Sequence, residues 1–271
     1  MIQVTKNVFV ENGMMACNLG MLVTKKGVVL IDTPMQPTNA VKWRNEADKK
    51  GEIKYLINTE EHPDHWQGSY FFPGVLITSQ NTRAKLEKTP SAEVMETVKH
   101  IDPPGLPLMK DYKVRLADIT VEESLTIYLG AHTIKLFRLP GHSTGGMGVY
   151  LPEEKVVFTS DVVFHKKKTW LQEADPRAWL ESLTKLNELD IDVVVPGHGD
   201  VCKKDYFKEQ GDIVKKWADA VQKAMKRGLT ADKAAAQIVS PDPYPKQEGT
   251  PMTEAELHKT IVSHLYKYYS N

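Results

Sequence analysis

The sequence has few cysteines and no surplus of charge of either sign. Cys17 and Cys202 are the only cysteines among its 271 residues, and no CxxC spacing is present. We therefore expect neither a disulfide framework nor a thiolate zinc site, and a reducing compartment is the default. The 35 basic and 35 acidic residues balance, which argues against a dedicated nucleic-acid or membrane-surface binder.

Long apolar segments are also missing. No apolar run approaches the ~20 residues that a membrane-spanning helix needs, and residues 1–12 lack the basic region and apolar core of a signal peptide. We therefore predict a cytoplasmic protein that does not enter a membrane. The sequence around Ser143 lacks a GxSxG context, so it does not match that nucleophile motif.

What is present is an ordinary globular composition, with 41% hydrophobic and 26% charged residues. Apolar runs and period-two alternation predict strands, and apolar residues at helical spacing predict helices. Thr38 is placed to cap the first helix, while Asp175 and Pro176 form a strong helix start. The expected strands are 4–10, 20–31, 53–57, 75–78, 124–128, 133–139, 149–151, 156–159 and 191–195, and the expected helices are 38–47, 85–88, 92–100, one from 176, one after 205, 231–239, and one after a Thr253/Glu256 capping box.

Two regions have no simple pattern of this kind. Residues 102–107 hold three prolines, and we do not expect them to be helical because proline lacks the backbone donor and clashes with the preceding turn. We interpret residues 83–113 as an insertion or lid-like excursion that shapes substrate access. The apolar stripes of the C-terminal helices are expected to cover the main domain, and a homodimer face is the alternative.

The densest cluster of chemically active side chains is the six-residue stretch from Glu60 to His65, directly after the apolar run 55–57. Glu60 and His62 alternate, so in an extended segment they point the same way. Pro63 then bends the chain and presents Asp64 and His65 in another direction. One short loop thus offers ligands to two neighbouring metal ions, although a polar surface turn is the simpler alternative.

Three further polar sites follow apolar strands in the same way. His142 follows residues 136–140, Asp161 follows 156–160, and His198 follows 193–196. Strands that end at one edge of a sheet bring such residues together, and ligand sites gather at that edge. The glycines that flank His142 and His198 permit tight turns.

This order of motifs closely resembles the metallo-β-lactamase superfamily over about residues 4–200. The family's HxHxDH motif, lone histidine, lone aspartate and last histidine are matched, except that Glu60 stands at the first histidine. Asp32 matches the family's early aspartate, usually a structural residue beside the ligands. The resemblance implies an α/β protein with an αββα sandwich and additional C-terminal helices. We expect a catalytic domain over residues 1–205 and a helical extension, 206–271, packed on it.

Carried over residue by residue, the resemblance implies two divalent metal ions. His62 and His142 would bind the first ion, with Glu60 as our hypothesis for its third ligand. Asp64, His65 and His198 would bind the second ion, and Asp161 would bridge the two. Zinc is the first expectation; the carboxylate at position 60 hardens the site, which makes manganese or iron alternatives.

The chemistry that such a pair of ions implies is hydrolysis. A metal-activated hydroxide would attack an ester, lactone, thioester, lactam or related bond of a small molecule. Asp161 would hold the ions together, His198 would help to stabilise the oxyanion, and Asp64 would take a proton if the second ion is absent. The alternatives are an iron-dependent oxidoreductase acting on oxygen or sulfur species and a non-catalytic metal-binding scaffold.

Four residues near the predicted ligands are candidates for contact with the substrate. His165 follows Asp161 closely and is a candidate at the rim of the site, and Lys166 begins a run of three lysines that would attract an anionic substrate. Trp66 and Trp170 are candidates for the mouth of the site, although tryptophans more often pack in a core.

Overall fold

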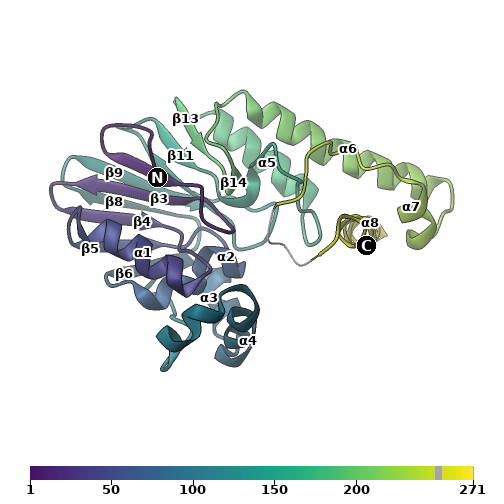
Figure 1. Ribbon diagram of the computed structural model, residues 1–271. Coiled ribbons are helices and arrows are strands. Elements are labelled where there is room, and N and C mark those ends of the chain that lie inside the picture. The colour runs from purple at the N-terminus through teal and green to yellow at the C-terminus, as the bar shows by residue number, and fades with distance from the viewer. Residues whose placement is uncertain (248–251, 271) are drawn as a thin grey trace.

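Two β-sheets packed face to face form the centre of the protein in a computed structural model, of which residues 1–247 and 252–270 are described (Figure 1). The first sheet has seven strands in sequence order, β1 (Ile2–Gln3), β2 (Val8–Glu11), β3 (Leu19–Thr24), β4 (Gly27–Ile31), β5 (Ile53–Ile57), β6 (Val75–Ser79) and β7 (Ile119–Val121). The second sheet has the order β13 (Val193–Val195), β11 (Val156–Phe158), β10 (Met147–Leu151), β9 (His132–Arg138) and β8 (Ser124–Leu129).

Helices cover the outer faces of both sheets, so that the layers run helix, sheet, sheet, helix. Trp43 of α1 (Pro37–Asp48) is buried with Leu30 and Leu56 of the first sheet. Trp179 of α5 (Pro176–Asn187) is buried with residues of the second sheet. The predicted αββα architecture is therefore confirmed.

The inner core lies between the sheets and contains side chains from both. Val29 and Ile57 come from the first sheet, and Leu136 and Val149 come from the second. Strands β4 to β7 are parallel to one another, and β11 is parallel to β13. Because parallel strands end at the same edge, the loops after these strands open on a common side of the sandwich.

The chain continues after the second sheet into long helices. Helix α6 (Tyr206–Lys226) packs on α5 within one apolar cluster, and α8 (Glu254–Ser270) contacts both α6 and α7 (Ala231–Gln237). Figure 1 shows α6 extending away from the sheets, with α7 and α8 near its far end. The expected capping box is present, because Thr253 Oγ1 accepts from the Glu256 N–H at 3.2 Å and Glu256 Oε2 accepts from the Thr253 N–H at 2.8 Å. The division at residue 205 remains a prediction.

Several expected boundaries were wrong for local reasons. Residues 20–31 form two antiparallel strands rather than one, because Gly27 at φ +127° closes a turn after Thr24. Strand β2 starts only at Val8. Thr38 does not cap α1: the helix begins at Pro37, and the Thr38 N–H donates instead to Asp102 Oδ2 at 2.8 Å.

The segment 83–113 is more ordered than expected. It continues from α3 (Gln80–Leu86) into α4 (Ser91–Ile101) and then the 3-10 helix η2 (Pro103–Met109). The expectation of no helix at 102–107 was therefore wrong, because prolines at the start of a short 3-10 turn forfeit no hydrogen bond. Side chains of these elements pack in a small apolar core, to which α4 contributes Val98 and η2 contributes Met109.

The remaining short elements lie beside the strand ends. They are α2 (Pro63–Trp66), η1 (Gln67–Phe71), η3 (Ser160–Val162) and a two-stranded sheet of β12 (Phe164–His165) and β14 (His198–Gly199). No helix within the described ranges is both long and apolar enough to cross a membrane.

Candidate metal centre

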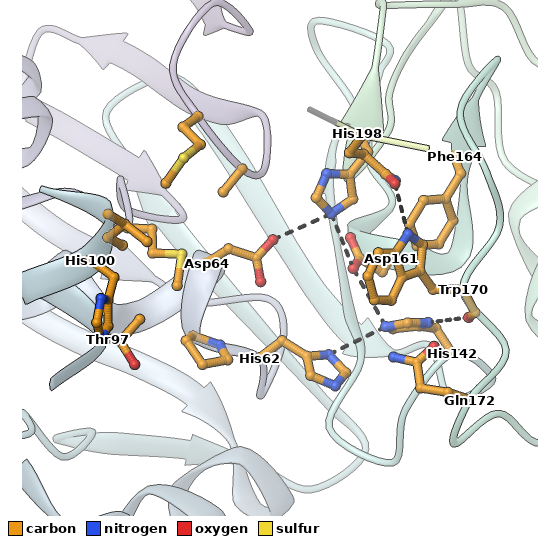
Figure 2. Close-up of a pocket in the computed structure, with 16 residues that line it drawn as sticks. His62, Asp64, Thr97, His100, His142, Asp161, Phe164, Trp170, Gln172 and His198 are labelled. Carbon is orange, nitrogen blue, oxygen red and sulfur yellow. Dashed lines mark hydrogen bonds and ion pairs between the residues drawn. The ribbon is translucent and has the colours of Figure 1, made fainter. Parts of the chain in front are cut away.

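The polar residues predicted at the ends of four strands converge on one cavity. Figure 2 shows His62, Asp64, His142, Asp161 and His198 facing it together. Their loops follow β5, β9, β11 and β13, and three of these strands belong to parallel pairs whose ends share an edge.

The first group of candidate ligands is Glu60, His62 and His142, whose ligand atoms all lie within 4.8 Å of one another. His62 Nδ1 lies 3.0 Å from Glu60 Oε1 and 3.3 Å from His142 Nε2. Glu60 is 1% exposed, so its carboxylate is directed into the protein rather than turned to solvent. The structure thus places Glu60 where a third ligand would stand.

The second group is Asp64, His65 and His198, and its ligand atoms also lie within 4.8 Å of one another. Pro63 begins the one-turn helix α2, which carries Asp64 and His65 away from the direction of His62. Asp64 Oδ2 lies 3.4 Å from His198 Nε2 and 3.9 Å from His65 Nε2.

Asp161 lies between the two groups. One oxygen, Oδ1, is 3.2 Å from His65 Nε2, while the other, Oδ2, is 3.3 Å from His198 Nε2 and 3.5 Å from His142 Nε2. A carboxylate with contacts to histidines of both groups has the position that a bridging ligand requires.

The donors fit metal ions in spacing and in chemistry. Tetrahedral ligands at bonds of 2.0–2.1 Å stand roughly 3.3 Å apart, and most of the separations in the cluster are close to this. His65 Nε2 and Asp161 Oδ1 are buried and have no hydrogen-bond partner within the described ranges, although they face each other. Buried polar atoms are rarely left in this state, so these two atoms fit a place where a cation would bind.

The environment gives the metal-free site mixed protonation states. Burial would lower the pKa of His62, His65 and His198, but acidic neighbours outweigh it and raise the pKa of all three, so a bound cation would have to displace protons from them. Burial lowers the pKa of His142, which favours the neutral imidazole. Burial would raise the pKa of Asp161, but His198 and His65 hold it well below its usual range. Burial would likewise raise the pKa of Glu60, yet the hydrogen bond and charge of His62 lower it to about 2. Both carboxyl groups are therefore ionised at neutral pH.

A second layer of contacts orients His65. Its outer nitrogen, Nδ1, lies 2.9 Å from Asp32 Oδ2, and Asp32 also accepts from Thr59 N at 2.7 Å and Thr59 Oγ1 at 2.6 Å. Asp32 takes the left-handed conformation at φ +59°, a strain typical of functional sites. Such a carboxylate fixes the tautomer of a ligating histidine.

Cys17 stands close to Asp32 and His65 but does not add a third metal site. Burial raises the pKa of its thiol to about 12. Its Sγ donates to the Asp64 carbonyl oxygen at 3.0 Å, which requires the protonated thiol. Asp32 and His65 are meanwhile occupied with each other.

Glu173 is a contact that the sequence did not reveal. Its Oε1 binds the outer nitrogen, Nε2, of His62, and its Oε2 lies 3.9 Å from Lys85 Nζ. Glu173 precedes α5 with no recognisable motif and lies 111 positions from its partner, so no local pattern marks it. Glu173 thus contacts the outer nitrogen of His62 in the same way that Asp32 contacts the outer nitrogen of His65.

Two glycines are needed for close approach at the ligands. A Cβ on Gly197 would lie 1.9 Å from Asp161 Oδ1, and a Cβ on Gly141 would lie 2.5 Å from the Trp179 Cα. Gly141 also has φ +150°, and Gly199 has φ +91°. The expected role of glycines beside His142 and His198 is therefore present in the backbone.

The cavity above the ligands has a volume of about 520 Å³, within the range of small-molecule sites. In Figure 2, Thr97 and His100 stand across the view from Trp170 and Gln172. Thr97 and His100 belong to α4, so the segment 83–113 does contribute to the cavity wall.

The expected substrate residues are placed unevenly. Trp170 lines the cavity, whereas Trp66 is 2% exposed and donates to the Glu61 carbonyl oxygen inside a small core. His165 packs edge-on against Tyr206, and with Lys166 it lines a separate surface hollow. Trp66, His165 and Lys166 are therefore absent from the lining of the ligand cavity: Trp66 packs in the small core, and the other two line the separate hollow.

Comparisons with known proteins agree with this geometry. A sequence model described as the metallo-beta-lactamase superfamily matches residues 12–198. A hydroxyacylglutathione hydrolase of Bartonella henselae is 27% identical over 187 residues, covering 67% of this chain and 62% of that protein. One from Mesorhizobium japonicum is 39% identical over 77 residues, 28% of this chain and 30% of that protein. The matches therefore span less than two thirds of these relatives' own lengths.

Solved structures share the fold at low identity. A metallo-beta-lactamase from Pontibacter korlensis has a TM-score of 0.64 at 18% identity, covering 79% of this chain and 97% of that one. A stereoselective inverting sec-alkylsulfatase from a Pseudomonas species has a TM-score of 0.71 at 15% identity, covering 99% of this chain and 50% of that one. The second likeness extends beyond residue 198 into the C-terminal helices.

Proposed function

The chain belongs to the metallo-β-lactamase superfamily, and from this membership we propose that it is a metal-dependent hydrolase acting on a small molecule. The observation that carries the proposal is the pair of ligand groups on either side of Asp161, open to one cavity. The bond cleaved is an ester, lactone, thioester or lactam. The relatives named hydroxyacylglutathione hydrolase support hydrolysis as the reaction class.

The residues would hold two divalent ions, zinc first, with manganese or iron as the alternatives that Glu60 favours. Glu60, His62 and His142 would form one site, and Asp64, His65 and His198 the other. When bound, such ions supply Lewis acidity and a nucleophilic water at neutral pH.

The protein's own residues would position and exchange protons around that chemistry. Asp161 fixes the separation of the two groups through its contacts to His142, His65 and His198. His198 lines the cavity, where its ring stacks on Phe164 with the centroids 5.2 Å apart. His198 or the second ion would help to stabilise a developing oxyanion. The Asp64 side chain is 20% exposed and lines the cavity, so it is the carboxylate that would take a proton if the second ion is absent.

The direct test combines elemental analysis with a hydrolysis screen. Purified protein would be assayed on esters, lactones, thioesters, lactams and phosphoesters, with and without added zinc, manganese and iron. We expect metal-dependent cleavage that is lost in Asp161→Ala and retained in Cys202→Ser, a substitution away from the ligands. Activity that survives both metal removal and Asp161→Ala would overturn the proposal. Iron content together with colour and oxygen consumption would favour the oxidoreductase alternative.

A further inference from the structure

The walls of the ligand cavity are apolar. Apart from the ligands, its lining consists of Met15, Ala16, Met35, Pro63, Ile101, Phe164 and Trp170, with Thr97, His100, Gln172 and Gln247 as the polar members. Two methionines and a tryptophan offer adaptable apolar area to an acyl chain or ring. The polar members offer hydrogen-bonding groups that can fix the orientation of a ligand.

No lysine or arginine lines this cavity within residues 1–247 and 252–270. Lys85 reaches Glu173 beside His62, but Glu61 Oε1 at 3.3 Å and Glu173 Oε2 at 3.9 Å already hold its ammonium group. Lys168 Nζ is bound to the Asp242 carbonyl oxygen at 3.0 Å. The described cavity lining therefore offers no lysine or arginine to pair with a carboxylate of a substrate.

The ligand set adds to this electrostatic character. Glu60, Asp64 and Asp161 place three carboxylates around two divalent ions, which leaves a single net positive charge shared by both sites. With a histidine in place of Glu60, the two sites would share two net positive charges. The carboxylate at position 60 thus weakens the attraction of the loaded site for an anion, and the apolar walls offer no lysine or arginine as a further charged partner.

We infer that the substrate is an uncharged, apolar acyl compound, such as an ester, a lactone or the thioester of a neutral thiol, rather than an anionic glutathione thioester. The inference rests on the proposed hydrolase function and specifies its substrate class. Water adds to the acyl carbon, the bond from that carbon to oxygen or sulfur breaks, and the departing group takes a proton to leave as an alcohol or thiol. The products are one carboxylic acid and one alcohol or thiol, or a hydroxy acid from a lactone.

A matched pair of thioesters tests the inference on activity. Hexanoyl-N-acetylcysteamine and hexanoylglutathione share the acyl chain and the reacting bond, but only the second carries two carboxylates. We expect kcat/KM to be at least about tenfold higher for the neutral thioester. The reason is that the cavity lacks a charged contact for the carboxylates of the glutathione thioester, and one such contact changes affinity by about this factor. Lengthening the acyl chain by one methylene should raise kcat/KM by about twofold to fourfold until the cavity is full.

A second pair separates this inference from the hydrolase proposal. S-hexyl-N-acetylcysteamine and S-hexylglutathione are thioethers, which cannot be hydrolysed, and calorimetry measures their binding whether or not the protein is a hydrolase. We expect the neutral thioether to bind at least about tenfold more tightly. Preference for the neutral ligand without any hydrolysis would overturn the proposed function and leave the cavity's specificity standing.

Thr97 offers a change of charge at the cavity wall without touching a ligand. Thr97→Arg should reduce the preference for the neutral thioether by about fivefold to tenfold, because it adds a cationic side chain to the cavity wall. Thr97→Gln adds comparable length without charge and should leave the preference unchanged. Equal or tighter binding of S-hexylglutathione by the wild-type protein, or a Thr97→Arg variant with an unaltered preference, would overturn the inference.

Discussion

Removing the carboxylate of Glu173 should weaken the first metal site and spare the second. Glu173 Oε1 binds His62 Nε2, the nitrogen that faces away from Glu60 and His142. A ligating histidine depends on such a partner for its tautomer and ring orientation, and loss of the partner typically costs 10- to 100-fold in affinity. His62 is the only ligand of the two groups that Glu173 contacts through a hydrogen bond within the described residues.

The solvent exposure of Glu173 and His62 determines how much their hydrogen bond contributes to metal affinity. A hydrogen bond to a charged group contributes about 1.5–3 kcal/mol when it is shielded. The Glu173 side chain is 41% exposed and that of His62 is 18% exposed, so solvent screening reduces the contribution to roughly 1–1.5 kcal/mol. Glu173→Ala should therefore weaken the first metal by about tenfold, and Glu173→Gln, which keeps an acceptor without the charge, by about threefold.

Titration of metal-free protein against a competing chelator would resolve the two affinities. Asp212→Asn is the matched control, because Asp212 is an exposed carboxylate that pairs with Lys208 on α6. We expect this control to bind both ions like the wild type. If Glu173→Ala did so too, Glu173 would not orient His62. Equal weakening of both sites would point to a general loss of structure instead.

Three further changes probe the ligands and their supports. Glu60→His should shift metal preference towards zinc over manganese by about tenfold, because imidazole is the softer ligand; competition between the two metals measures this, and an unchanged preference would exclude Glu60 as a ligand. Asp32→Asn should weaken the second metal by about 10- to 100-fold. It should add no backbone strain to that already present, since asparagine adopts the left-handed conformation as readily as aspartate. Chelator titration would show the loss of affinity, and wild-type affinity would contradict it. Gly197→Ala should lower hydrolytic activity by at least about 100-fold, because its Cβ would overlap Asp161 Oδ1. Gly211→Ala on α6 is the control, since its Cβ would meet only ordinary contacts, and it should retain activity. Equal activity of the two variants would refute the predicted overlap.

The candidate ligands were accessible from the sequence because each follows a strand that ends at the shared edge. His142, Asp161 and His198 lie far apart in the chain, yet the parallel direction of their strands brings them together. The glycines next to His142 and His198 were also informative, because the backbone there makes turns that a side chain would obstruct. Local patterns were sufficient wherever backbone geometry alone fixed the position.

Contacts between side chains of distant loops were not accessible in this way. Glu173 precedes α5 without any motif, and only the packing of its loop against the 60–65 loop reveals its partner. Trp66 has the sequence position of a residue at the mouth, but α2 turns its ring into the core formed with α3 and α4. Asp102 takes over the role expected of Thr38 by reaching across 64 positions to the start of α1.

Diffraction measured at the absorption edges of zinc, manganese and iron on crystals of the metal-loaded protein tests the proposed centre most directly. We predict two anomalous peaks in each chain, one among Glu60, His62 and His142 and one among Asp64, His65 and His198, with Asp161 in contact with both. A single peak, or peaks outside this cavity, would contradict the proposed two-metal site.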